Sequence, residues 1–161
     1  MIKRLLALAL LVTPALATAQ TTVTATASVA ATSTLSVASN VDFGAVTPGT
    51  VVTLAPNAVG AGRVDVAFNT TTATVTVPTS VLLTNTTYGT ATMTANLTCN
   101  TDGSATAGAC GAQNFNYNGS NAALASGSVY IGGGIPAANS AGARVGTYNG
   151  SISVTVANSG V

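Results

Sequence analysis

The sequence predicts an all-β fold, either a sandwich or a barrel. Apolar residues alternate with Thr, Ser or Asn along most of the chain, which is the periodicity of a strand with one buried face. Turn signals such as Pro48-Gly49 and Asn118-Gly119 separate these stretches at the spacing of short strands. No window after Gln20 has the 3.6-residue apolar stripe of an amphipathic helix. We therefore expect many short strands and little helix.

Residues 1–19 are predicted to be a secretory signal peptide, cleaved before Gln20. Lys3 and Arg4 form a positive start, an apolar run follows at residues 5–12, and small residues lie at 15–19. The apolar run is far shorter than the ~20 residues that span a bilayer, which argues against an uncleaved anchor. We expect a secreted protein of the cell surface, with no stable membrane insertion of its own.

Residues 20–34 are predicted to be an N-terminal extension that acts as a donor strand. Alternation runs unbroken over residues 23–37, about 50 Å at ~3.3 Å per residue, which is longer than a usual strand. This stretch must therefore break into two strands or project from the domain. It contains no Pro, Lys or Glu, the residues that commonly protect an exposed strand edge. The apolar face of the extension consists of Val23, Ala25, Ala27, Val29 and Ala31.

Residues 35–161 are predicted to form the β-domain. The clearest strand is at residues 90–99, where Ala91, Met93, Ala95, Leu97 and Cys99 alternate with polar residues. Other alternating strands are predicted at residues 63–68, 72–77 and 151–156, and weaker ones at 35–37, 41–46, 51–54, 81–83, 115–117 and 129–131. The glycine run at residues 132–134 is predicted to be a flexible turn.

Cys99 and Cys110 are predicted to form one disulfide. They are the two cysteines of an apparently exported chain, and a Gly/Ser/Ala-rich stretch between them lets the chain double back. Closing a loop of this size stabilises a fold by roughly 3 kcal/mol in the chain-entropy model. A metal or redox pair is the alternative, but CxxC spacing, His and further ligands are lacking.

The charge content excludes several classes of function. Charged residues make up 4% of the chain, against about a quarter in a typical protein. After the predicted cleavage the charged residues are Arg63, Arg144, Asp42, Asp65 and Asp102. Without Lys, Glu or His we expect no enzyme, no catalytic residues, no cofactor and no metal site, and no nucleic-acid partner. The three Asp are expected to cap turns or pair with an Arg; a calcium site assembled from them is the alternative.

Five Asn-x-Ser/Thr sequons raise the hypothesis of glycosylation. In a chain this rich in Asn and Thr, chance matches are expected. The hypothesis, with surface glycans as the corresponding partners, rests on how little charge is available to keep the surface soluble. The candidate positions are Asn69, Asn85, Asn96, Asn118 and Asn149.

Two segments are similar to motifs of an exported bacterial family, a domain of unknown function rich in Ala and Thr. Residues 35–50 contain Phe43-Gly44, and residues 146–156 contain Gly146-x-Tyr148-x-Gly150. More loosely, the chain resembles fimbrial subunits: small, exported, Thr/Ala/Gly-rich and with one disulfide. That resemblance implies an immunoglobulin-like or pilin-like antiparallel β-sandwich whose extended N-terminal strand completes the sandwich of a neighbouring subunit.

We therefore expect a structural subunit of an extracellular filament, similar to a pilus or fimbria, that polymerises by donating its N-terminal strand to the next copy. Such a head-to-tail contact does not close, so the partner is a homo-polymer. The alternative is a monomeric secreted or cell-surface binding module for carbohydrate or surface attachment. A small outer-membrane barrel is a third hypothesis, weakened by the few aromatic residues.

Overall fold

The computed structural model describes residues 24, 26–117 and 125–159. The predicted signal peptide, Val23, Ala25 and the sequon residue Asn118 lie outside these residues. The predicted donor residues Ala27, Val29 and Ala31 lie within them.

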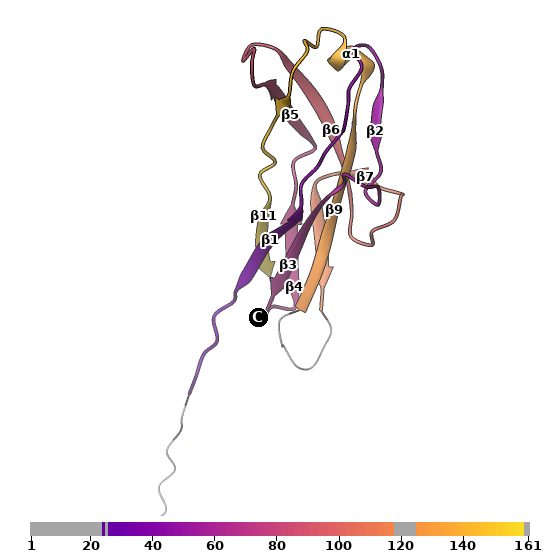
Figure 1. Ribbon diagram of the computed structural model, residues 1–161. Helices are drawn as coiled ribbons and strands as arrows, with labels where there is room; N and C mark the ends of the chain where they lie inside the picture. The colour runs from indigo at the N-terminus through magenta and orange to yellow at the C-terminus, as the bar shows by residue number, and fades with distance from the viewer. Residues whose placement is uncertain (1–23, 25, 118–124, 160–161) are drawn as a thin grey trace, which may run out of the picture.

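The described chain forms two antiparallel β-sheets that pack face to face, with strands running along the long axis of the domain (Figure 1). In the larger sheet the hydrogen-bonded order is β1 (Ser33–Ser39), β3 (Gly62–Phe68), β9 (Ala125–Ile135), β6 (Thr92–Asn100), β5 (Ser80–Asn85) and β10 (Tyr148–Asn149). Two short strands join it at the side, β2 (Val52–Leu54) on β9 and β7 (Gly108–Ala109) on β6. The smaller sheet consists of β11 (Thr155–Ser159), β4 (Thr72–Thr76) and β8 (Ala112–Asn116). This architecture confirms the predicted all-β antiparallel sandwich.

The core lies between the sheets and is made by the alternating residues of the central strands. Val66 and Phe68 of β3, Val75 of β4, Leu97 of β6 and Val129 of β9 are each at most 2% exposed. Phe68 contacts Phe115 of the opposite sheet, with 6.4 Å between the ring centroids. The period-two alternation that predicted these strands therefore also identified the faces that pack together.

The glycine run at residues 132–134 is not the predicted turn, because it lies inside β9. Gly133 pairs with both Leu54 of β2 and Leu97 of β6. Its φ is +150°, and a Cβ there would collide with the carbonyl oxygen of Asn96. Glycine is needed at this position because its φ is positive and the backbone of β6 approaches closely.

The predicted disulfide between Cys99 and Cys110 is confirmed, with the two Cα atoms 4.8 Å apart. Cys99 belongs to β6, and Cys110 follows β7, which pairs with the end of β6. The turn between them is held by Asn100, whose Nδ2 donates to the Ser104 and Thr106 carbonyls at 2.8 and 2.9 Å. The disulfide thus closes a loop that is also fixed by hydrogen bonds.

Helix is scarce among the described residues, as expected. The helix α1 (Ala137–Ser140) is one turn long and joins β9 to the segment that leads to β10. No helix in the described part of the chain has the length and apolar character needed to cross a membrane.

Candidate functional site

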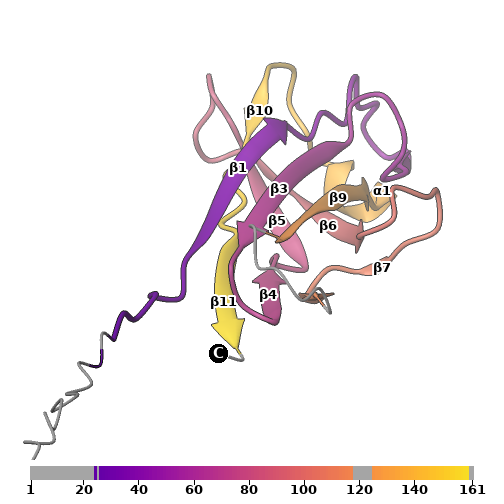
Figure 2. The same ribbon diagram turned by 90° about the horizontal axis from the view of Figure 1, so that it is seen from below.

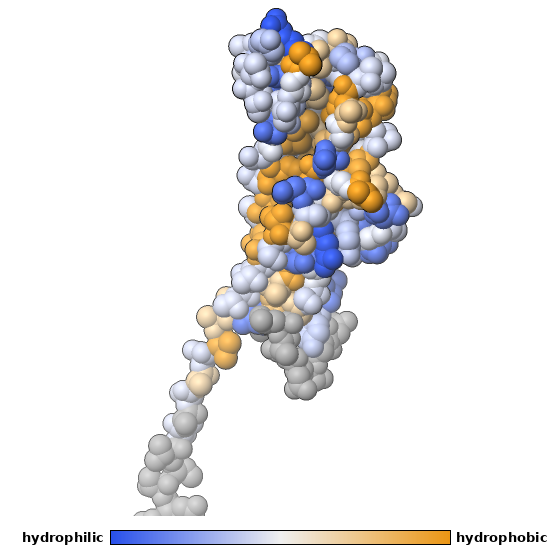
Figure 3. Space-filling view, in the orientation of Figure 1, coloured by the Kyte–Doolittle hydropathy of each residue, from blue (hydrophilic) through white to orange (hydrophobic). Residues whose placement is uncertain are grey.

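A groove of about 1260 Å³ with an apolar floor runs between β1 and the segment that leads into β11. One wall is β1 and residues 40–48, which carry Leu35, Val37, Val41, Phe43 and Val46. The other wall is residues 143–154, which carry Tyr148, Ile152 and Val154. The floor is the core of the larger sheet, with Val64, Val81, Leu83, Met93, Ile131 and Ile135. Apolar surface is gathered along this face of the domain in Figure 3.

Both walls have backbone without a strand partner on the groove side. Within the described residues, β1 is bonded to β3 alone, so its other edge is open. Residues 151–154 make no backbone hydrogen bond to any other described segment. The sequence predicted a strand over residues 151–156, but β11 starts only at Thr155. The burial of residues 151–154 still alternates, since Ile152 and Val154 are half-buried and Ser151 and Ser153 are exposed. These residues therefore have the pattern of a strand but no neighbouring strand bonded to them.

The groove face of β1 is set by its register on β3. Leu35 pairs with Val66 and Val37 with Val64, and paired residues of antiparallel strands share a face. Val64 is 5% exposed, whereas Val37 beside it is 69% exposed. Val37 therefore belongs to the inner face of the sandwich but has nothing packed over it.

The N-terminal extension leaves the domain at the start of β1, at the end where β11 also finishes (Figures 1 and 2). Ser33 and Thr34, which the sequence prediction placed in the extension, are the first residues of β1. Residues 26–32 are exposed, and Val29 is 85% exposed. The long alternating stretch thus both ends in a strand and projects from the domain.

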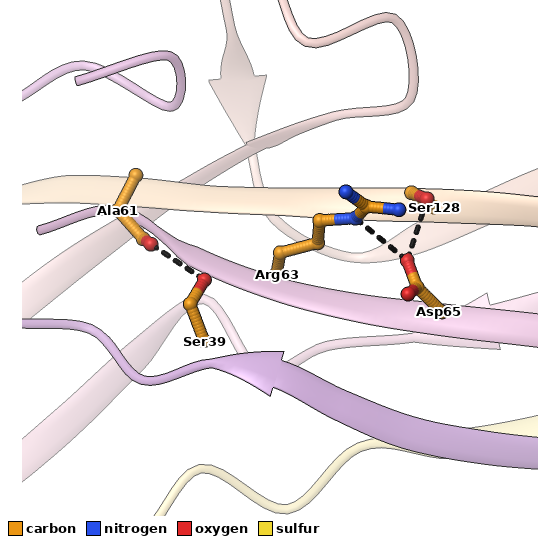
Figure 4. Close-up of polar contacts among 5 residues, drawn as sticks. All are labelled: Ser39, Ala61, Arg63, Asp65 and Ser128. Atoms are coloured by element: carbon orange, nitrogen blue, oxygen red, sulfur yellow. Dashed lines mark hydrogen bonds and ion pairs between the residues drawn. The ribbon is translucent and has the colours of Figure 1, made fainter. Parts of the chain in front are cut away.

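Single polar side chains hold both ends of β1. At its start, Asn69 Nδ2 donates to the Ala30 carbonyl at 2.9 Å, and Asn69 Oδ1 accepts from the Thr32 amide at 2.6 Å. The Asn69 backbone amide also donates to the Thr32 carbonyl at 3.2 Å. At its end, Ser39 Oγ donates to the Ala61 carbonyl at 2.9 Å (Figure 4). These bonds define where the chain joins and leaves the sheet.

The second wall is anchored by Asn85, at the end of β5. This side chain is 1% exposed, and its Oδ1 accepts from the amides of Thr87 and Tyr88, both at 2.9 Å. Its Nδ2 donates to the Val145 carbonyl at 3.4 Å. A Cβ at Gly146 would be 2.8 Å from that Nδ2, so glycine lets the segment pass close to Asn85.

The three Asp residues have pairing or turn-capping roles, as the sequence predicted. Asp65 accepts from Ser128 Oγ and from Arg63 Nε, both at 2.7 Å, on the sheet face opposite the core (Figure 4). The Ser128 hydrogen bond, followed by the Arg63 contact, lowers the pKa of Asp65. Asp42 accepts from the Gly44 amide at 2.8 Å and Asp102 from the Ser104 amide at 3.0 Å. Among the described residues no three metal-ligating side chains come together.

The sequon residues differ in their accessibility. Asn85 is buried, and the amide nitrogen of Asn69 is engaged with Ala30, so neither is free for a glycan in the folded domain. Asn96 and Asn149 are exposed. Glycosylation at these exposed positions stays a prediction.

Comparisons with known proteins assign the chain to no family. No family model matches it, so the resemblance to the Ala/Thr-rich exported family is not confirmed. No curated protein matches it either. A solved chain from a structure titled "Chaperone-tip adhesin complex is vital for synergistic activation of CFA/I fimbriae biogenesis" is similar at 17% identity and a TM-score of 0.44. The match covers 78% of this chain and 41% of that one, and a likeness at this level assigns no function.

Proposed function

We propose that the protein is a structural subunit of an extracellular filament, and that each subunit donates its N-terminal extension to the groove of the next copy. The observation that carries the proposal is that one chain has both a groove that lacks a strand and a strand-like extension that lacks a neighbour. The groove lacks a strand along both walls. Residues 26–29 of the extension continue the alternating pattern, and they make no hydrogen bond to the described residues of their own domain. This role needs no catalytic residue.

The chemistry of the two surfaces is complementary. A strand laid between β1 and residues 151–154 would find open backbone donors and acceptors on both sides, which supplies affinity. Its apolar side chains would cover the exposed face of Val37 and the floor beneath, which sets the register. The apolar side chains that would enter the groove are those of Val23, Ala25, Ala27 and Val29. Ala31, the fifth predicted donor residue, lies between Ala30 and Thr32, which Asn69 bonds within the same domain.

The length of the extension suits the length of the groove. Residues 20–29, which precede the bonds to Asn69, reach about 33 Å when extended at ~3.3 Å per residue. The wall that faces it spans residues 35–46, a similar number of residues. Because donor and acceptor are different surfaces, the contact is heterologous and repeats without closing, which produces a filament.

The substitution Val29→Asp tests the proposal. It places a carboxylate on the apolar face of the extension, where donation would bury it unpaired at a cost of about 3 kcal/mol or more, a loss of at least about 100-fold in subunit affinity. Ser28→Asp is the matched control, because it adds the same charge to the opposite face. Both residues are exposed and outside the domain, so the fold should be unaffected.

The measurement is negative-stain microscopy and size-exclusion chromatography of surface material from cells that export the full chain. Thin uniform fibres are expected for the unchanged chain and for Ser28→Asp, and particles of one domain for Val29→Asp. Single-domain particles from the unchanged chain would instead favour a monomeric binding module. Equal assembly of both variants would contradict donation of this strand.

A further inference from the structure

We infer that Asn69 and the phase of the alternation keep the extension out of the groove of its own domain, so that a free subunit remains able to assemble. This inference rests on the proposed function and concerns its regulation. It arises because the extension is covalently attached to β1, one wall of the groove that it would fill. Insertion within one chain would therefore compete with donation to a neighbour.

Insertion within one chain requires a hairpin between the extension and β1. A two-residue turn at Ala31 and Thr32 would pair Val29 with Thr34 and Ser28 with Leu35. Since paired residues share a face, Ser28 would then point into the groove with Leu35, and Val29 would point outward with Thr34. Any turn with an even number of residues also pairs odd-numbered with even-numbered residues. The tightest hairpins would therefore place the polar face of the extension, and not its apolar face, against the core.

A three-residue turn over residues 30–32 restores the correct phase, because it pairs Val29 with Ser33 and Ala27 with Leu35. Such turns commonly need a left-handed residue at their third position, where glycine is favoured. Thr32 stands there, and a β-branched residue is disfavoured in that conformation. Three-residue turns over residues 29–31 or 31–33 also restore the phase, but they place Ala31 or Ser33, and not glycine, at the third position. The sequence therefore disfavours each of the short turns that would allow insertion.

Asn69 acts on the same three residues. Its side-chain amide bonds the Ala30 carbonyl and the Thr32 amide, and its backbone amide bonds the Thr32 carbonyl. These bonds continue the β1–β3 pairing beyond Phe68 and hold residues 30–32 in line with β1, on the edge of β1 away from the groove. To form the hairpin, the chain would have to give up all three bonds. Asn69 is thus a positioning residue that directs the extension outward.

A released variant that combines Asn69→Ala with Thr32→Gly tests the inference. It removes the side-chain bonds and supplies glycine at the third turn position. We expect the full chain to become a self-inserted monomer, with polymer reduced at least tenfold and with a higher urea midpoint of unfolding than the Val29→Asp monomer. The single variants Asn69→Ala and Thr32→Gly should give intermediate polymer yields.

Two controls separate self-insertion from other losses of assembly. Asn114→Ala with Thr101→Gly makes the same two changes of residue type outside the extension and the groove, and should polymerise normally. Asn114 accepts one exposed hydrogen bond from Thr74, and Thr101 is an exposed residue of the loop after β6. Adding Val29→Asp to the released variant should lower its urea midpoint to that of Val29→Asp alone, because the inserted strand is then expelled.

The outcomes distinguish this inference from the proposed function. Polymerisation of the released variant at the level of the unchanged chain would overturn the role of Asn69 while leaving donation intact. A released monomer whose urea midpoint does not respond to Val29→Asp would overturn it as well. Assembly of the unchanged chain that is insensitive to Val29→Asp would instead overturn the proposed function.

Discussion

Two asparagine side chains, Asn69 and Asn85, hold the two segments of chain that border the groove. An Asn side-chain amide both donates and accepts, so it can make the pair of hydrogen bonds that a backbone amide and carbonyl of a neighbouring strand would make. Asn69 does this for Ala30 and Thr32, and Asn85 does it for Val145 and the turn at Thr87 and Tyr88. The sequence marked both only as sequons in turn-like stretches. Their structural roles depend on partners more than 35 positions away in the chain, at Ala30 and at Val145.

Asp65 predicts how stability changes with pH. Its pKa is lowered in the fold, first by Ser128 and then by Arg63, so its stabilising contribution is fully present above the unfolded value of about 3.9. The contribution is lost as the pH falls through the lowered folded value. Ser128→Ala should make the loss of stability below about pH 4 shallower, by less than about 1 kcal/mol because the Asp65 side chain is 35% exposed.

Urea unfolding at pH 7 and at several pH values below 4 measures this effect. The Ser128→Ala curve should approach that of the unchanged chain at low pH and lie below it at pH 7. Ser126→Ala, on the same strand, is the control and should shift both ends of the profile equally. A Ser128→Ala deficit that is the same at every pH would show that packing rather than the carboxylate is responsible.

At the scale of elements, β1 is a strand with one satisfied and one open edge. Its bonds to β3 run from Ser33 to Ser39, with a register shift after Val37, and no strand among the described residues is hydrogen-bonded to its groove edge. Natural edge strands are usually protected by charge, Pro or bulges. β1 contains no Pro and no charged residue, and its register shift comes only after Val37, so the edge from Ser33 to Val37 is unprotected. An unprotected edge is what the proposed function requires of a strand that receives a partner.

The substitution Val37→Asp tests the groove wall independently of the extension. Val37 is 69% exposed, so the isolated domain should tolerate the carboxylate with a change below about 1 kcal/mol. In the proposed filament the same carboxylate would lie against the donated strand, and assembly should fall at least tenfold. Thr34→Asp, on the opposite face of β1, is the matched control.

Thermal unfolding of the monomer and microscopy of assembled material measure the two effects. Loss of fibres with Thr34→Asp as well would indicate a general intolerance of charge on β1. Normal fibres with Val37→Asp would place the donated strand somewhere other than this wall.

At the scale of the whole molecule, the fold is a sandwich that is open along one side. The walls meet in the lower half of the domain, where β1 and β11 are in contact, and separate above it. The extension leaves from that lower end and points away from the domain (Figure 1). A donor attached at one end and a groove that opens toward the other suit a linear series of subunits.

A peptide of residues 20–32 should complete the sandwich in trans. Added to the Val29→Asp chain, it should stabilise the fold in a concentration-dependent way. At a peptide concentration 100 times its Kd, the free energy of unfolding should rise by about 2.7 kcal/mol and the melting temperature by roughly 5–10 °C. The same peptide with Val29→Asp should have no effect. Differential scanning calorimetry measures the shift, and an equal shift with both peptides would contradict recognition of the apolar face.

The sequence by itself determined most of the strands, their inner faces and the disulfide, because alternation and cysteine spacing are local properties. The strand predicted at residues 41–46 is wrong, since these residues form no strand. Residues 92–99 and 63–68 show this, since their buried residues are those that the pattern predicted. The tertiary structure alone decided that Gly133 lies within a sheet, that residues 151–154 have no strand beside them, and that β1 forms a groove wall. Those features depend on which distant backbones become neighbours, and an alternating strand has the same sequence pattern whether its edge is paired or open.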